Sequence, residues 1–91
     1  MPAVHLVISG RVQGVGFRIF VERQALKRGV RGWVRNRRDG TVEALIIGDE
    51  RALGEMEAAC RRGPSLAVVT QLDRFDAADD GSDGFEARPT A

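Results

Sequence analysis

Three glycines, a glutamine and two arginines lie close together near the start of the chain, in the segment Gly-Arg-Val-Gln-Gly-Val-Gly-Phe-Arg at positions 10–18. Glycine admits backbone conformations that side chains forbid, and it lets a ligand approach the main chain closely. Where such a loop runs into a helix, its N–H groups and the positive end of the helix dipole favour a bound anion. The planar guanidinium of Arg18 can then close over two oxygens of a phosphate or carboxylate.

The same segment also fits a simpler interpretation, a turn between a strand and a helix beside a solvated arginine. It is not a Walker loop, because no Lys-Ser or Lys-Thr pair follows the last glycine. Its glycine spacing also differs from that of the dinucleotide-binding fingerprint. Taken alone, these residues leave anion binding and a plain turn both open.

Segment 10–18 resembles the first signature of the acylphosphatase family. A second stretch, Gly-Trp-Val-Arg-Asn at 32–36 followed by Gly40, Val42 and Gly48, resembles the second signature of that family in spacing and residue type. The likeness covers nearly the whole chain and is weakest after Phe75. It implies a small α/β sandwich that hydrolyses acyl phosphates to carboxylate and inorganic phosphate without a metal or cofactor.

By this resemblance the catalytic residues are Arg18, which clamps the phosphoryl group, and Asn36, which orients the attacking water. The backbone amides implied to bind phosphate are those of Gln13, Gly14, Val15, Gly16 and Phe17. An acyl phosphate needs no general acid at neutral pH, because its leaving group is a stabilised carboxylate; binding, charge stabilisation and water placement remain. Without the second signature, Asn36 would be interpreted as a turn residue bonded to its own backbone.

Length and composition limit the number of domains and the class of protein. The 91 residues suffice for one domain, so we expect a single domain over 1–91, and 43% hydrophobic with 30% charged residues is typical of an ordinary globular protein. No apolar run approaches the roughly 18 residues that cross a bilayer, so we expect a cytoplasmic location. A single cysteine, Cys60, and a single histidine, His5, exclude an internal disulfide and argue against a zinc site.

Hydrophobic periodicity and turn residues predict an order of strand, helix, strand, strand, helix, strand and a short terminal strand. The expected strands are 3–9, 30–36, 41–47, 68–75 and 85–88, the expected helices run from 17 to 28 and from a cap at Asp49 to Gly63, and 77–84 is a solvated acidic loop. This order is typical of a ferredoxin-like α+β fold, a mainly antiparallel sheet with both helices on one face. The acidic loop and the Pro-Thr-Ala tail match no motif, so the pairing and length of the last strand stay open, while the assignment of the site residues does not depend on them.

Several conspicuous side chains are interpreted as structural. His5 lies in a strand with no second metal ligand or acid beside it in the sequence. Cys60 shares an apolar helix face with Leu53 and Met56, which favours a core position over a nucleophile. Trp33 is interpreted as a packing residue.

Charge is distributed unevenly along a chain whose net charge is only +1. Nine basic residues and one acid lie between positions 10 and 38, whereas five acids and no base lie between 76 and 86. The basic segment would speed the encounter with a small anion, yet it also suits a nucleic-acid-binding module on a ferredoxin-like sheet. Against that alternative, the chain has no tyrosine, and Phe75 and Phe85 are its candidate sheet aromatics.

A second alternative is a non-catalytic anion sensor with the same cleft, which turnover alone would distinguish from an enzyme. We expect a small-molecule acyl phosphate as substrate and inorganic phosphate as product and inhibitor. We further expect a monomer that binds no nucleic acid and no membrane.

Overall fold

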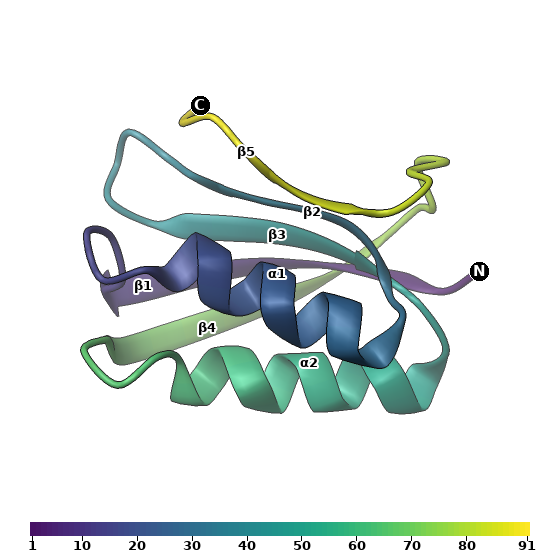
Figure 1. Cartoon of the computed structure of the whole chain (residues 1–91), viewed down its shortest axis with the longest axis horizontal. Helices are drawn as coiled ribbons and strands as arrows, with labels where there is room; N and C mark the ends of the chain where they lie inside the picture. Colours follow the sequence, from purple (N-terminus) through teal and green to yellow (C-terminus); the bar gives the residue numbers. More distant parts are fainter.

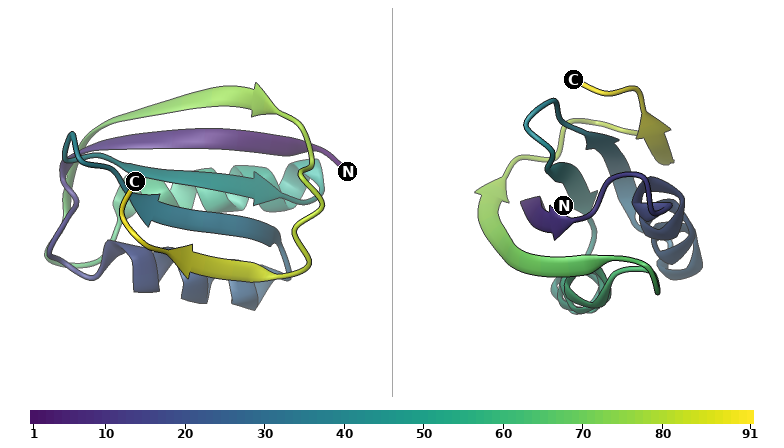
Figure 2. Two further views of the ribbon diagram at one scale, coloured as in Figure 1. Left: turned by 90° about the horizontal axis from the view of Figure 1, so that it is seen from above. Right: turned by 90° about the vertical axis from the view of Figure 1, so that its left-hand side faces the viewer.

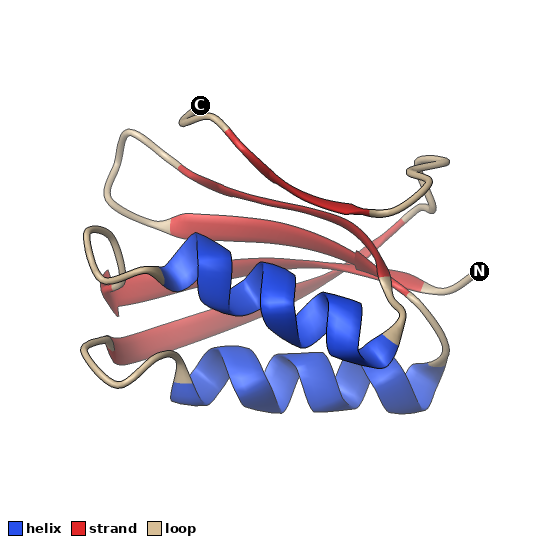
Figure 3. Cartoon of the chain, viewed as in Figure 1, coloured by secondary structure: helices blue, strands red, loops and turns tan.

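A five-stranded sheet and two helices make up the structure, and the computed structural model describes all residues from 1 to 91 (Figure 1). The elements are β1 (Ala3–Arg11), α1 (Phe17–Arg28), β2 (Arg31–Asn36), β3 (Val42–Ile47), α2 (Glu50–Arg62), β4 (Val68–Ala77) and β5 (Phe85–Arg88). Both helices lie on one face of the sheet (Figures 2 and 3). The expected ferredoxin-like arrangement is thereby confirmed.

The strands follow one another across the sheet in the order β4-β1-β3-β2-β5. β1 pairs antiparallel with β3 and β4, and β2 pairs antiparallel with β3. β5 adds to the outer edge of β2 in parallel, with Phe85 opposite Gly32. The last strand therefore brings the end of the described chain alongside the β2–β3 hairpin.

Local signals set the helix boundaries. The backbone of Gly29 is left-handed after α1, with φ of 68°, and Gly63 ends α2 with φ of 67°. The carboxylate of Asp49 accepts a hydrogen bond of 2.8 Å from the N–H of Ala52 and so caps α2. Both helices thus begin and end where the sequence predicts. Neither is long and apolar enough to cross a membrane.

β1 and β4 each run two residues further than predicted. The register between them shifts at Ser9 and Gly10, and beyond this irregularity Gly10 and Arg11 still pair with β4. The segment that begins at Gly10 is therefore strand before it is loop. A register shift of this kind depends on the partner strand, which periodicity within one segment does not reveal.

The main core lies between the sheet and the helices. Leu6, Ile8 and Ile46 from the strands meet Val21 and Met56 from the helices there, all with no exposed surface. Cys60 is fully buried in the same cluster, and burial raises the pKa of its thiol to about 12. The interpretation of Cys60 as a core residue is confirmed.

A smaller apolar cluster covers part of the open sheet face. Trp33 packs there against Leu45 and Ile47 and is only 9% exposed. The guanidinium groups of Arg35 and Arg88 lie 4.7 and 5.0 Å from the centroid of its ring. The interpretation of Trp33 as a packing residue is confirmed.

The buried carboxylate of Glu43, on the same face, is hydrogen-bonded by two basic side chains. Glu43 is 6% exposed, accepts a hydrogen bond of 2.9 Å from His5 Nε2 and is bonded to Arg35. Burial raises the pKa of Glu43, but the hydrogen bonds from Arg35 and His5 outweigh burial and hold the pKa below its usual value. His5 therefore has a structural partner that lies 38 residues away in the sequence.

The acidic segment is a largely exposed loop over 78–84, as the sequence predicts, but two of its acids are bonded to β2. Ala77 belongs to β4, Asp79 is bonded to Arg31, and Asp80 accepts a hydrogen bond of 3.3 Å from Trp33 Nε1. The guanidinium of Arg31 holds the pKa of Asp79 below its usual value. Acids distant in sequence thus dock on the basic strand β2, a contact that no local pattern indicates.

The substitution Gly32→Ala should lower the free energy of unfolding by about 3 kcal/mol or more. The backbone of Gly32 has a φ of 131°, and a Cβ on this residue would lie 1.9 Å from the carbonyl oxygen of Leu45 in the neighbouring strand. The matched control is Gly54→Ala in α2, where a Cβ has no neighbour within 4 Å and helix propensity should add about 1 kcal/mol. Denaturant melts measure both; equal stabilities would mean that β2 and β3 accommodate a side chain at Gly32 without strain.

Candidate active site

The connection between β1 and α1 has a glycine-dependent backbone. Gly14 and Gly16 have φ of 73° and 78°, in the left-handed region that favours glycine. A Cβ on either residue would meet nothing within 4 Å, so the backbone conformation, not crowding, requires glycine here. Left-handed residues in such a loop can turn successive N–H groups toward one anion.

The two helices differ at their N-termini. Gly16 is the N-cap of α1, no side chain accepts a hydrogen bond there, and the first turn carries no acidic residue. α2 instead has the carboxylate of Asp49 as its cap and Glu50 in its first turn. The first N–H groups of α1 are therefore left for an external acceptor, and the helix dipole favours a negatively charged one.

Arg18 lies in this first turn and is anchored at one side. Its Nη1 donates a hydrogen bond of 3.0 Å to the carbonyl oxygen of Arg88 in β5. A guanidinium has five N–H donors, so the others remain free for a ligand. The pairing of the last strand, which the sequence leaves open, therefore matters here: β5 pairs in parallel with β2 and supplies the carbonyl oxygen that holds Arg18.

Asn36 ends β2 on the same side of that strand as the buried residue Val34. The turn that follows is held by Asp39, whose Oδ1 accepts hydrogen bonds from the Thr41 N–H at 3.0 Å and the Thr41 hydroxyl at 2.6 Å. Asp39, rather than Asn36, is thus the side chain that closes the turn. Asn36 is instead one of the residues that line a pocket.

Gln13 connects the glycine loop to the hairpin. Its Nε2 donates hydrogen bonds of 2.6 Å to the carbonyl oxygen of Arg37 and 2.9 Å to that of Thr41. These bonds fix the loop relative to the end of β2, where Asn36 lies. The sequence assigns Gln13 only a backbone role, because a glutamine in a loop gives no signal of such a distant partner.

One pocket of about 140 Å³ brings the sequence-predicted residues together. It is lined by Val12, Gly14, Gly16, Phe17, Arg18, Ile19 and Asn36. Both predicted catalytic residues and three of the five predicted backbone positions are in this set. Gln13 and Val15 belong to the same loop, but the side chain of Gln13 is bound to the hairpin and Val15 packs against the core.

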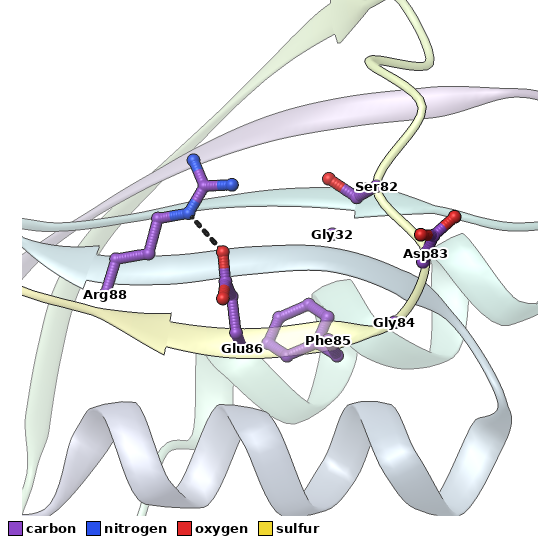
Figure 4. Close-up of a pocket in the computed structure, with 7 residues that line it drawn as sticks. All are labelled: Gly32, Ser82, Asp83, Gly84, Phe85, Glu86 and Arg88. Atoms are coloured by element: carbon purple, nitrogen blue, oxygen red, sulfur yellow. Dashed lines mark hydrogen bonds and ion pairs between the residues drawn. The ribbon is translucent and has the colours of Figure 1, made fainter.

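A larger hollow of about 350 Å³ lies beside β5 (Figure 4). It is lined by Gly32, Ser82, Asp83, Gly84, Phe85, Glu86 and Arg88. The guanidinium of Arg88 already donates a hydrogen bond of 2.7 Å to Glu86, and the carboxylates of Asp83 and Glu86 would repel an anion. The smaller pocket is therefore the candidate site for a phosphate.

Comparison with known proteins agrees with this geometry. The family model described as acylphosphatase matches residues 4–87. The chain belongs to the acylphosphatase family. The match contains both signature segments, 10–18 and 32–48, and so includes the whole of the small pocket.

Two acylphosphatases are similar to this chain over almost their full length. The acylphosphatase of Acidiphilium cryptum is 51% identical over 90 residues, which are 99% of each chain. The crystal structure of an acylphosphatase from Bacillus subtilis matches with a TM-score of 0.93 and 39% identity, over 97% of this chain and 99% of that one. HypF from T. kodakarensis matches with a TM-score of 0.85 and 30% identity, over 97% of this chain but 12% of its own.

Inorganic phosphate should bind in the small pocket and stabilise the fold. At a concentration of 100 times its Kd, phosphate should raise the free energy of unfolding by about 2.7 kcal/mol. The variant Arg18→Ala should lose most of this gain, whereas His5→Gln, on the open sheet face, should keep it. Thermal melts with and without phosphate measure the effect, and an equal shift in Arg18→Ala would exclude this pocket.

Proposed function

We propose that this protein hydrolyses acyl phosphates to a carboxylate and inorganic phosphate in the pocket between α1 and the end of β2. The observation that carries the proposal is that Arg18, Asn36 and the uncapped first turn of α1 converge on one pocket. Arg18 supplies charged donors and the backbone of α1 supplies neutral donors, both suited to the oxygens of a phosphoryl group. The amide of Asn36 has a donor and an acceptor, which suits a water molecule. Membership of the acylphosphatase family supports the same reaction.

The phosphoryl group binds by charge-assisted hydrogen bonds. In the proposed complex the backbone amides from Gln13 to Phe17 surround its oxygens, and the free donors of Arg18 make two parallel hydrogen bonds to them. The anchor from Arg18 to the carbonyl of Arg88 sets the direction of the guanidinium before substrate arrives. Donors fixed in advance stabilise the developing charge without reorganisation during the reaction.

Asn36 orients the attacking water in this proposal. The water oxygen forms a bond to phosphorus while the bond from phosphorus to the acyl oxygen breaks, and the bonding electron pair leaves with the carboxylate. Asn36 cannot take the proton at neutral pH, so the proton passes to solvent water or to a phosphoryl oxygen. Catalysis therefore rests on position and charge stabilisation.

We further propose that the enzyme needs no metal or cofactor, since the carboxylate leaving group is stable without a Lewis acid. Small-molecule acyl phosphates are its partners, and we propose a cytoplasmic monomer. On the open sheet face, Arg35 and Arg88 cover the ring of Trp33, and Phe75 is the exposed aromatic residue there. Of the two candidate stacking aromatics, Phe85 is buried in the core beneath the helices, so a single phenylalanine is left and the paired aromatic platform of an RNA-binding sheet is not formed.

Hydrolysis of benzoyl phosphate by purified protein in the presence of a chelator tests the activity directly. Wild-type protein should release phosphate rapidly, whereas Asn36→Ala should turn over at least about 100-fold more slowly. Phosphate affinity should stay within about tenfold in that variant, because the lost interaction is mainly with the attacking water. Phosphate binding without turnover in the wild type would identify an anion sensor instead.

Arg18→Lys separates geometry from charge. A lysine keeps the positive charge but cannot make two parallel hydrogen bonds to the phosphoryl oxygens. We expect kcat/KM for benzoyl phosphate to fall at least about 100-fold, which corresponds to about 2.7 kcal/mol. Steady-state kinetics alongside circular dichroism measure the loss in folded protein.

Two variants control for this experiment. His5→Gln and Cys60→Ala should keep the rate per folded molecule, because His5 is bonded to Glu43 on the open face and Cys60 is buried in the core. If Arg18→Lys retained more than about a tenth of the activity, charge alone would suffice and the bidentate clamp would be wrong.

A further inference from the structure

The small pocket is large enough for only part of a substrate. Its volume is about 140 Å³, well below the roughly 300–1,000 Å³ of pockets that enclose a drug-sized ligand. In the proposed function the phosphoryl group occupies this space, beside Arg18. The acyl group must then extend past the rim of the pocket, where whatever it touches can discriminate between substrates.

Ile19 is the one hydrophobic lining residue of the pocket that is exposed to solvent. Three of the seven lining residues are hydrophobic, and two of them, Val12 and Phe17, are almost fully buried at 0% and 2% exposure. Ile19 is 54% exposed. Ile19 is therefore the exposed hydrophobic residue of a pocket whose other lining residues are glycines, the two buried apolar residues, Arg18 and Asn36.

The position of Ile19 on α1 indicates that its side chain is not needed for packing the core. It follows Arg18 directly in the first helical turn, and both residues line the small pocket. The buried face of the same helix is formed by Phe17, Val21 and Ala25. Ile19 is on the other side and contributes to neither of the two core clusters.

We propose that Ile19 is a specificity residue that contacts the acyl group and favours substrates in which that group is apolar, such as an aromatic ring or an alkyl chain. This inference rests on the proposed function and assigns it a substrate class. Contact removes apolar surface of both partners from water, which favours such substrates over small or polar ones. The effect is modest, because an open rim surrounds the acyl group on one side only.

The test compares benzoyl phosphate with acetyl phosphate in Ile19→Ser, Ile19→Leu and Leu26→Ser. Leu26 is the matched control, since it is an exposed apolar residue of the same helix, 64% exposed, and it does not line the pocket. The measured quantity is the ratio of kcat/KM for benzoyl phosphate to kcat/KM for acetyl phosphate. Comparing this ratio between variants cancels the different intrinsic reactivities of the two compounds.

We expect the ratio to fall about fivefold in Ile19→Ser, below the roughly 10- to 200-fold that one methylene group gives in a closed hydrophobic pocket, because the rim is open. Ile19→Leu should keep the wild-type ratio, and Leu26→Ser should leave it unchanged. The inhibition constant of inorganic phosphate should change less than about twofold in Ile19→Ser, because phosphate has no acyl group to contact an apolar rim.

Other outcomes would overturn the inference in distinguishable ways. If wild-type protein hydrolyses both compounds and the ratio in Ile19→Ser stays at the wild-type value, the proposed function stands and the role of Ile19 is wrong. The same conclusion follows if Leu26→Ser shifts the ratio as much as Ile19→Ser. If the wild type hydrolyses neither compound, the proposed function fails and this inference fails with it. Thermal melts confirm that each variant is folded.

Discussion

The first turn of α1 has backbone N–H groups that no side chain of the protein accepts, and the rest of the site is arranged around them. Gly14 and Gly16 give the approach to this turn its left-handed backbone. Gln13 fixes the loop to the hairpin through two carbonyl oxygens. A helix N-terminus is electrostatically positive. At α2 the carboxylate of Asp49 accepts a hydrogen bond from this end of the helix, whereas the N-terminus of α1 has no such cap and still attracts an anion from outside the chain.

The sequence predicts well those features that are decided within a few residues. Asp49, Gly29 and Gly63 act on the backbone immediately beside them, and the helices begin and end where these residues predict. The candidate site residues come from the resemblance of two short segments to family signatures, and their roles stay a prediction. Arg18 and Asn36 each occupy a fixed place next to a glycine loop or a turn, and the fold of the two intervening elements brings them to one pocket.

Contacts between distant segments could not be predicted. The carbonyl oxygen of Arg88 that holds Arg18 belongs to the backbone. Every residue has such a carbonyl, so the residue type at position 88 does not indicate this contact. The pairing of Arg31 with Asp79 joins two charged segments that are 48 residues apart, and charge counts alone do not say which residues meet. The same holds for Glu43 between His5 and Arg35 on the open face.

The anchoring of Arg18 by β5 has a consequence for the order in which the protein is made. β5 follows every other element in the chain, so during translation from the N-terminus the ribosome presents the glycine loop, Arg18 and Asn36 well before residue 88. Until β5 pairs with β2, the guanidinium lacks the carbonyl that directs it. The final orientation of this side chain is therefore a late event in biosynthesis, acquired only after the sheet has received its fifth strand.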